Sequence, residues 1–515
     1  MPRGGRGYVA AVSDAEYEYG SDAAVPGTLR AKVASGTAWS MGASLAVLLS
    51  RAVVAVVLAR LLTPAEYGLA GMALLFTALV LVVSDVSLGA ALVQRRSIDE
   101  LDRSTVFWTS VAIGTGLTIG GIAVSGLVAS FFRQPDVQPM LAVVSISFLL
   151  MSLQMTQASL LQREMHFRAG AVRIAGSVVV GGIVAVVAAL LGAGAWTLIA
   201  QQLAVSATSV VLLWTVSAWR PKLMFSRARL RSLGGFGLSV FGANLVGYVN
   251  RNADNVLVGR YLGTGALGIY SVAYNVMLLP LSQLIVPLQD ALYPAFARVQ
   301  HDKERVAGIW LRVTTVVAGI VAPAMAGLAV VAPDFVDVVL GRRWAAAAPI
   351  LRILALVTLV QSVSSLGQKM LQALDRARTV LHFSVAGMIL TVASFVVGLR
   401  WGIVGVASSY ACVAVPIAVA FSCVTARALS VPLARLGSSV RGVFEATSVM
   451  VVVALVAQAS LDGTSSAVRL ALTIVAAALV YVPMCAWRVP LVRVELRRLL
   501  RRRRARVSVA GAADS

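Results

Sequence analysis

The chain has 515 residues, of which 59% are hydrophobic and 13% are charged, and its mean hydropathy is +0.85. Soluble domains carry about 25% charged residues, so the composition excludes a soluble protein and indicates a polytopic membrane protein of the all-α class. The formal net charge of +22 does not indicate nucleic-acid binding, because the sequence shows no soluble basic domain that could hold such a site.

Hydropathy predicts about fourteen transmembrane helices, because the apolar runs have the length of a helical span, about 20 residues, rather than the roughly 10 alternating residues of a barrel strand. In chain order the expected spans are residues 36–61, 67–93, 105–131, 138–161, 173–192, 194–217, 234–258, 266–291, 307–330, 345–371, 379–399, 402–425, 442–460 and 467–487.

These spans group into two pseudo-symmetric six-helix lobes followed by two extra helices. The expected segments are a disordered cytoplasmic tail (1–35), an N-lobe (36–218), a cytoplasmic linker between the lobes (219–233), a C-lobe (234–427), the two extra helices (428–487) and a basic cytoplasmic tail (488–515).

Each lobe opens with a copy of one segment, and the two copies are 200 residues apart without a gap. The matched positions are Gly42/Gly242, Ala43/Ala243, Leu45/Leu245, Arg51/Arg251, Arg60/Arg260, Leu62/Leu262, Gly68/Gly268, Ala73/Ala273 and Leu79/Leu279. Both copies run outward from the cytoplasmic side, so the repeat is parallel. Parallel two-lobe transporters bind substrate between the lobes near the middle of the membrane.

The repeated span carries an arginine at membrane depth, Arg51 in one copy and Arg251 in the other. Desolvating arginine in lipid costs at least about 2.5–3.5 kcal/mol. We therefore expect both side chains to face either a cavity for an anionic substrate or an ion-pair network within each lobe. Phosphate is the natural anionic group, because guanidinium matches its geometry.

Two carboxylates and four uncharged side chains complete the candidate site. Asp254 lies three residues after Arg251 on the same helical face and is its candidate partner, and Asp85 is the candidate partner of Arg51. The candidates for polar lining of the cavity are Asn244, Tyr248, Asn250 and Asn255.

The distribution of Lys and Arg sets the expected orientation. The outer segments hold only Arg60, Arg133, Arg260, Arg342, Arg343 and Arg400, and most of the other basic residues fall in inner segments. Both termini are therefore expected in the cytoplasm, with the protein in the plasma (inner) membrane. The outer loops are short, and the longest is around Pro333–Trp344, so we expect no extracytoplasmic domain with a catalytic site.

The C-terminal basic run, Leu496–Val507, alternates arginine with apolar residues and favours attachment to anionic lipid, at about 1 kcal/mol per basic residue. The cysteines Cys412, Cys423 and Cys485 lie in apolar spans without metal-ligand spacing. The sequence contains no G-x-x-x-x-G-K-[ST], H-E-x-x-H or G-x-S-x-G motif. We therefore expect neither enzymatic activity nor a metal or cofactor.

Several stretches taken together resemble the Wzx-type polysaccharide flippases, above all the WzxC-like and lipopolysaccharide biosynthesis proteins, in the polysaccharide-transport branch of the MOP exporter superfamily. The stretches are ARLLTPAEYGL (59–69), SDVSLGAALVQ (84–94), DRSTVFW (102–108), LLQREMHFR (160–168), GAGAWTLIAQQ (192–202), NLVGYVNRNADNVLVGRYLGTGALGIYSVAYNVMLLP (244–280), LGRRWAAAAPILRILAL (340–356) and LQALDRAR (371–378). The resemblance covers about residues 30–430, and the second copy replaces TPAEYG with GTGALG.

The resemblance implies translocation of undecaprenyl-diphosphate-linked oligosaccharide to the outer leaflet for exopolysaccharide, capsule or lipopolysaccharide synthesis. Carried over by position, Arg51 and Arg251 would face the diphosphate, and Asp85 and Asp254 would be candidates for ion coupling. The implied partners are the lipid-linked oligosaccharide, a polysaccharide polymerase and glycosyltransferases. The alternatives are a drug exporter or peptidoglycan-precursor flippase of the same superfamily, a membrane-embedded polymerase or ligase, and a non-transporting scaffold of a synthesis complex.

Overall fold

The computed structural model describes residues 47–84, 89, 92, 93, 95, 97–234, 237–298 and 301–489, and throughout these residues it is helical with connecting turns. A first helix covers residues 47–61. The other long helices are α2 (Pro64–Ser84), α4 (Glu100–Phe132), α5 (Val137–Val144), α6 (Ile146–Arg163), α7 (Phe167–Leu190), α8 (Trp196–Val216), α9 (Arg227–Gly234), α10 (Gly237–Pro280), α11 (Val286–Arg298), α12 (Lys303–Phe335), α13 (Ala347–Ser364), α14 (Gly367–Ala373), α15 (Ala377–Gly398), α16 (Gly402–Ala428), α17 (Leu433–Ser460) and α18 (Ser466–Arg488). Short π-helical segments, η1 (Leu281–Ile285) and η2 (Val336–Leu340), and short 3-10 segments, η3 (Arg342–Trp344) and η4 (Leu399–Trp401), lie between them.

Ten segments of the described chain are long and apolar enough to cross a membrane. Two of them reverse direction and contain two passes each. In α10 the reversal is at Gly263, whose φ of 88° is open to glycine, and Tyr270 reaches back to within 3.0 Å of Asp254. A straight helix would separate those residues by about 24 Å. The second reversal, at η4, ends at Gly402, with a φ of 69°.

The helix 47–61 and α2 correspond to the first two predicted spans, so the described helices agree with about fourteen passes, and the all-α polytopic fold is confirmed. The fourth pass differs from a simple span, because it is divided at Ser145 into α5 and α6. The first predicted span begins at residue 36, and residues 36–46 lie outside the described residues.

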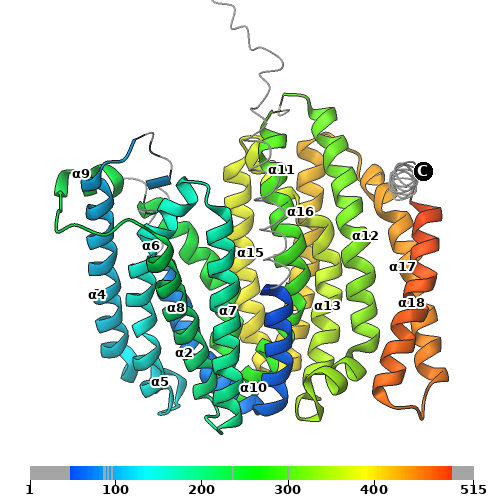
Figure 1. Ribbon diagram of the computed structural model, residues 1–515. Helices are drawn as coiled ribbons and strands as arrows, with labels where there is room; N and C mark the ends of the chain where they lie inside the picture. The colour runs from blue at the N-terminus through cyan, green and yellow to red at the C-terminus, as the bar shows by residue number, and fades with distance from the viewer. Residues whose placement is uncertain are drawn as a thin grey trace, which may run out of the picture.

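The helices form two groups that stand side by side (Figure 1). Helices α2 and α4 to α8 pack together in one group, and α10 to α16 pack in the other, while α17 and α18 pair with each other and lean on α12. Glycine permits close approach inside the first group: a Cβ on Gly114 of α4 would lie 2.5 Å from Ser152 Oγ of α6, and one on Gly181 of α7 would lie 2.3 Å from Val205 of α8.

The two groups touch where α2 crosses α10, a contact that we call the glycine crossing and that consists of Gly68 and Gly268 with the carbonyls of Pro64 and Thr264. A Cβ on Gly68 would lie 1.8 Å from the Thr264 carbonyl oxygen, and a Cβ on Gly268 would lie 1.9 Å from that of Pro64. These two glycines are equivalent positions in the sequence repeat. The two copies of the repeat therefore contact each other here, and each copy supplies the same kind of contact.

A second contact between the groups closes the same end of the bundle, and we call it the latch. Trp344 is fully buried, and its indole Nε1 donates to the carbonyl oxygen of Ala59 at 2.7 Å. Its ring meets that of Tyr67 edge-on at 5.7 Å. Arg60 donates to the carbonyl oxygen of Val338 in η2. The loop between α12 and α13 thus holds the end of the first helix.

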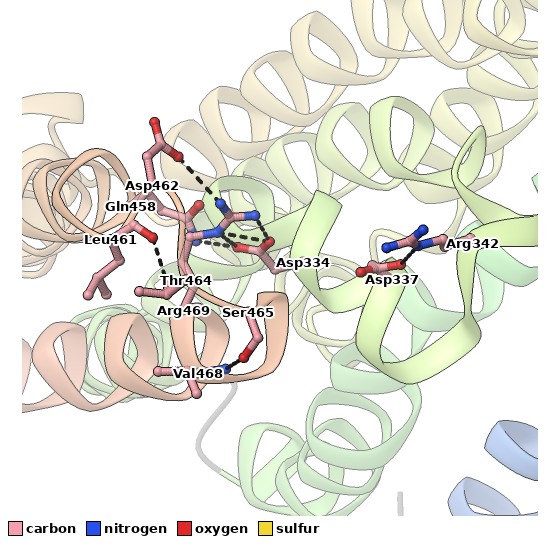
Figure 2. Close-up of polar contacts among 10 residues, drawn as sticks. All are labelled: Asp334, Asp337, Arg342, Gln458, Leu461, Asp462, Thr464, Ser465, Val468 and Arg469. Atoms are coloured by element: carbon pink, nitrogen blue, oxygen red, sulfur yellow. Dashed lines mark hydrogen bonds and ion pairs between the residues drawn. The ribbon is translucent and has the colours of Figure 1, made fainter.

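At the same end, a buried ion pair ties α17 and α18 to α12 (Figure 2). Asp334 is 2% exposed, and its carboxylate oxygens lie 2.9 and 3.0 Å from Nε of Arg469. Gln458 donates to the same carboxylate at 2.8 Å, and Arg469 reaches Asp462 at 3.4 Å. A buried carboxylate needs such partners, because burying it unpaired costs several kcal/mol of desolvation.

The opposite end of the bundle carries α9 and is called the α9 end below (Figure 1). There the segment between α8 and α9 lies along the start of α4 as a strap. Trp108 donates to the Lys222 carbonyl at 2.8 Å, and Trp219 donates to Glu100 at 2.9 Å. Arg229 in α9 lies 3.0 Å from Asp99. The segment expected as a linker between lobes is therefore fixed to the first helix group.

Candidate functional site

A cavity of about 980 Å³ lies between the two helix groups. The first group contributes residues of the helix 47–61, of α6 and of α7, and the second contributes the α10–η1 segment, α12 and η2. The cavity reaches from His166 and Gly170, near the α9 end, to Ala59 and Leu340 beside the latch. It therefore follows the boundary where a parallel two-lobe protein is expected to hold its substrate.

The charge of the cavity has one sign. Arg51 and Arg173 line it together with His166, and no Asp or Glu is found among the described lining residues. Two guanidinium groups in an apolar surrounding create a strongly positive potential, because low-dielectric walls reduce screening. The cavity is therefore suited to an anionic group.

The two arginines are held differently. Arg173 donates to Ser209 Oγ at 2.9 Å and to Gln154 Oε1 at 3.3 Å, so α6 and α8 fix the position of its guanidinium. Arg51 has an exposed side chain and makes no hydrogen bond or ion pair within the described part of the chain. Arg173 is thus a preoriented cation, and Arg51 keeps its donors available.

The second helix group supplies uncharged polar side chains. Asn275, Ser282 and Gln283 line the cavity opposite the arginines, and Gln162 adds an amide on the first group. Amide and hydroxyl groups donate and accept hydrogen bonds, as sugar hydroxyls require. The cavity thus has a cationic wall and a neutral polar wall.

Of the residues singled out from the sequence, Arg51 alone is found among the described residues that line this cavity. Arg251 lies on α10 with an exposed side chain and forms no ion pair with described residues. Asp254 is 1% exposed, and its carboxylate accepts hydrogen bonds from Tyr270 at 3.0 Å and from the backbone N–H of Asn255 at 2.7 Å. The structure therefore places Asp254 against a tyrosine hydroxyl rather than against Arg251.

The candidate polar lining residues lie along α10. Tyr248 is buried and donates to the Leu75 carbonyl of α2, so it bridges the two helix groups. Asn255 is 7% exposed, and its Oδ1 has no hydrogen-bond partner among the described residues. Asp85 and the side chains of Asn244 and Asn250 lie outside the described part of the chain.

Arg173 was missed in the sequence, where it counts as one of the basic residues that flank an inner loop. The predicted span begins at residue 173, whereas in the structure α7 begins at Phe167 and Arg173 lies almost two turns inside it. A cation that far from the helix start cannot be assigned to the loop. Among the described residues no group of three or more His, Cys, Asp or Glu is placed to hold a metal ion.

The sequence has relatives of recorded role. Residues 57–349 match the family described as polysaccharide biosynthesis protein. The chain is 30% identical to the lipopolysaccharide biosynthesis protein WzxC of Escherichia coli (strain K12), over 72% of this chain and 76% of the relative. It is 26% identical to the teichuronic acid biosynthesis protein TuaB of Bacillus subtilis (strain 168), over 87% and 94%.

The fold is found in solved transporters. The lipid II flippase MurJ, in an inward closed conformation, superposes with a TM-score of 0.71 at 16% identity, covering 87% of this chain and 98% of that chain. An inward-facing multidrug resistance MATE transporter of the MOP superfamily gives a TM-score of 0.62 at 14% identity, covering 75% and 94%. The chain therefore belongs to the polysaccharide biosynthesis protein family and is a multi-pass membrane protein with the fold of the MOP superfamily of transporters.

Proposed function

We propose that this protein flips undecaprenyl-diphosphate-linked oligosaccharide repeat units across the plasma membrane for the synthesis of a cell-surface polysaccharide. The observation that carries this function is the cavity between the helix groups, which holds Arg51 and Arg173 and no carboxylate among its described lining residues. The relatives named after lipopolysaccharide and teichuronic acid synthesis support a polysaccharide intermediate as cargo.

The two walls of the cavity contact different parts of the substrate. The diphosphate lies against the cationic wall, where guanidinium groups bind phosphate oxygens in pairs. The sugars lie toward Asn275, Ser282 and Gln283 on the neutral wall. Arg51 has unused donors and makes the adaptable contact, while Arg173 is fixed by Ser209 and Gln154.

The orientation follows from charge. The α9 end carries Arg220 and Lys222 in the strap and Arg227 and Arg229 in α9, and by the positive-inside rule we infer that this end faces the cytoplasm. The glycine crossing and the latch then close the outer side. With this orientation the conformation is inward-facing, and transport requires both contacts to separate while the α9 end closes.

A leaflet-accessibility assay tests this function. The protein is reconstituted in vesicles with lipid-diphosphate oligosaccharide, and an external glycosidase reports substrate that reaches the other leaflet. We expect protein-dependent access that falls at least tenfold in Arg51→Ala and in Arg173→Gln. The matched control is Arg312→Gln, an exposed arginine of α12 outside the cavity. Absence of protein-dependent access under an imposed ion gradient would refute flipping.

Arg251→Ala distinguishes a symmetrical site, formed by Arg51 and Arg251, from a site formed by Arg51 and Arg173. A symmetrical pair of cations, as the repeat suggests, predicts equal loss in Arg51→Ala and Arg251→Ala. The cavity lining favours larger loss at Arg51 and Arg173, because Arg251 is outside it.

The alternative within the superfamily, a drug exporter, is less well supported by a cavity with two arginines, because an anion-binding wall repels cationic drugs. Drug resistance on overexpression, with no change in the cell-surface polysaccharide, would favour the drug exporter.

A further inference from the structure

Away from the transport cavity, a second hollow of about 490 Å³ lies between α17 and α18 at the α9 end. Arg441 and Arg488 stand on its two sides, Glu445 lies between them, and Phe444 and Met484 form apolar walls. None of these residues lines the cavity between the helix groups. The hollow is therefore a separate site.

The three charged residues form a clamp of defined geometry. Nε of Arg441 lies 2.7 Å from Glu445 Oε1, and Nε of Arg488 lies 3.4 Å from Glu445 Oε2. Each arginine thus meets the carboxylate through Nε, and among the described residues its terminal N–H donors remain available for another acceptor, since guanidinium has five donors. The clamp retains a net charge of about +1.

The backbone brings the two arginines together. A Cβ on Gly442 would lie 2.8 Å from the carbonyl oxygen of Arg488, so α17 and the last turn of α18 are in contact because residue 442 is glycine. Trp487 directly precedes Arg488 and is 63% exposed, and the Arg488 guanidinium lies over its ring, 4.7 Å from the ring centroid. Exposed tryptophan with arginine at a helix end is typical of the membrane–water boundary.

Below the clamp the surface is apolar. The outward faces of α17 and α18 expose Val449, Val452 and Val456, and Leu472, Leu479 and Val482, between 39% and 69%. These two helices stand at the edge of the bundle (Figure 1). A cationic hollow at the boundary with apolar helix faces beneath it matches the shape of a phospholipid, with a phosphate above its acyl chains.

We propose that the Arg441–Glu445–Arg488 clamp binds the headgroup phosphate of an anionic phospholipid, in the leaflet at the α9 end. The phosphate oxygens accept hydrogen bonds from the terminal N–H groups of both arginines, and Glu445 positions the two guanidinium groups. The acyl chains lie along α17 and α18. The leaflet is the cytoplasmic one if the proposed orientation holds, but the site itself does not depend on the transport function.

Native mass spectrometry of the full chain tests the site. The protein is purified in detergent, supplied with phosphatidylglycerol or phosphatidylcholine, and the retained lipid is counted. We expect the wild type to retain phosphatidylglycerol over phosphatidylcholine, and Arg441→Gln/Arg488→Gln to reduce that retention about tenfold or more. The matched control is Arg435→Gln, an exposed arginine of α17 outside the hollow, which should retain lipid as the wild type does.

Glu445→Gln distinguishes a clamp from simple charge attraction. Charge alone predicts stronger retention when a carboxylate is removed, whereas loss of positioning predicts weaker retention. Unchanged or stronger retention would overturn the clamp. Arg441→Lys/Arg488→Lys keeps the charge but not the forked donors and should also lose retention, which keeps the test decisive if the glutamine pair fails to fold.

A third lipid, a polyprenyl diphosphate, identifies the source of the phosphate. Retention of this lipid alone would overturn a phospholipid site and place the hollow on the route of the transported substrate. The double glutamine variant is also assayed for flipping in neutral vesicles. We expect wild-type flipping there, so failure of the clamp and failure of the transport function give different results.

Discussion

The glycine crossing should decide how firmly the bundle is closed at the end opposite α9, which is the outer side in the proposed orientation, and Gly68→Ala perturbs this contact with one methyl group. The new Cβ would lie 1.8 Å from the Thr264 carbonyl oxygen and 2.8 Å from the Gly268 backbone nitrogen. Both neighbours are backbone atoms of α10, so no side chain can rotate away. The oxygen would have to recede to at least about 3.0 Å, which requires α2 and α10 to separate.

Forcing an extra methyl into a packed contact costs about 1–3 kcal/mol. This penalty falls on the conformation in which α2 and α10 touch and is absent where they are apart. The equilibrium should therefore shift toward the outward-open conformation by about 5–150-fold. Gly268→Ala should act in the same way, because its Cβ would lie 1.9 Å from the Pro64 carbonyl oxygen.

Cysteine accessibility measures this shift. Cys412, Cys423 and Cys485 are replaced, and a single cysteine is introduced at Ala55, which lines the cavity. A membrane-impermeant maleimide added from outside should label it slowly in the parent and faster in Gly68→Ala. The matched control is Gly265→Ala in the same region, because a Cβ there meets nothing within 4 Å. Unchanged labelling in a folded Gly68→Ala protein would refute the assignment of this crossing as the outer closure.

Three further predictions concern the latch, the buried ion pair and the cavity. Trp344→Phe removes the 2.7 Å hydrogen bond to Ala59 and should raise labelling of the cysteine at position 55 from outside severalfold, since such a bond contributes about 0.5–1.5 kcal/mol. Labelling equal to that of the parent would contradict the role of the latch. Asp334→Asn leaves Arg469 without its buried partner and should destabilise the protein by about 3–5 kcal/mol. The measurement is the fall in thermal unfolding temperature in detergent. As a control, Asp462→Asn changes the exposed partner of the same arginine and should cost under about 1 kcal/mol. Arg173→Gln should weaken the binding of a lipid diphosphate by about 10–150-fold, because it removes a charge-assisted hydrogen bond worth about 1.5–3 kcal/mol. Unchanged affinity in a binding titration would show that Arg173 is not part of the diphosphate site.

The class of the protein can be predicted from hydropathy and the length of apolar runs, because both are local properties of the chain. Fourteen passes, an all-α fold and a parallel repeat all follow from runs of apolar residues and from the match of Gly68 with Gly268. The repeat even marked the pair of glycines that meet at the glycine crossing, since only glycine permits backbones to approach so closely.

Which polar residues share a site could not be predicted in this way, because the rotation of each helix about its axis depends on packing with distant segments. Arg51 and Arg251 are equivalent in sequence, yet only Arg51 lines the cavity, and Arg173 joins it from α7. Asp254 lies near Arg251 along the helix but bonds to Tyr270, which comes close only through the reversal at Gly263. A linear pattern orders residues along one helix, and the cavity is formed by the faces that several helices turn toward one another.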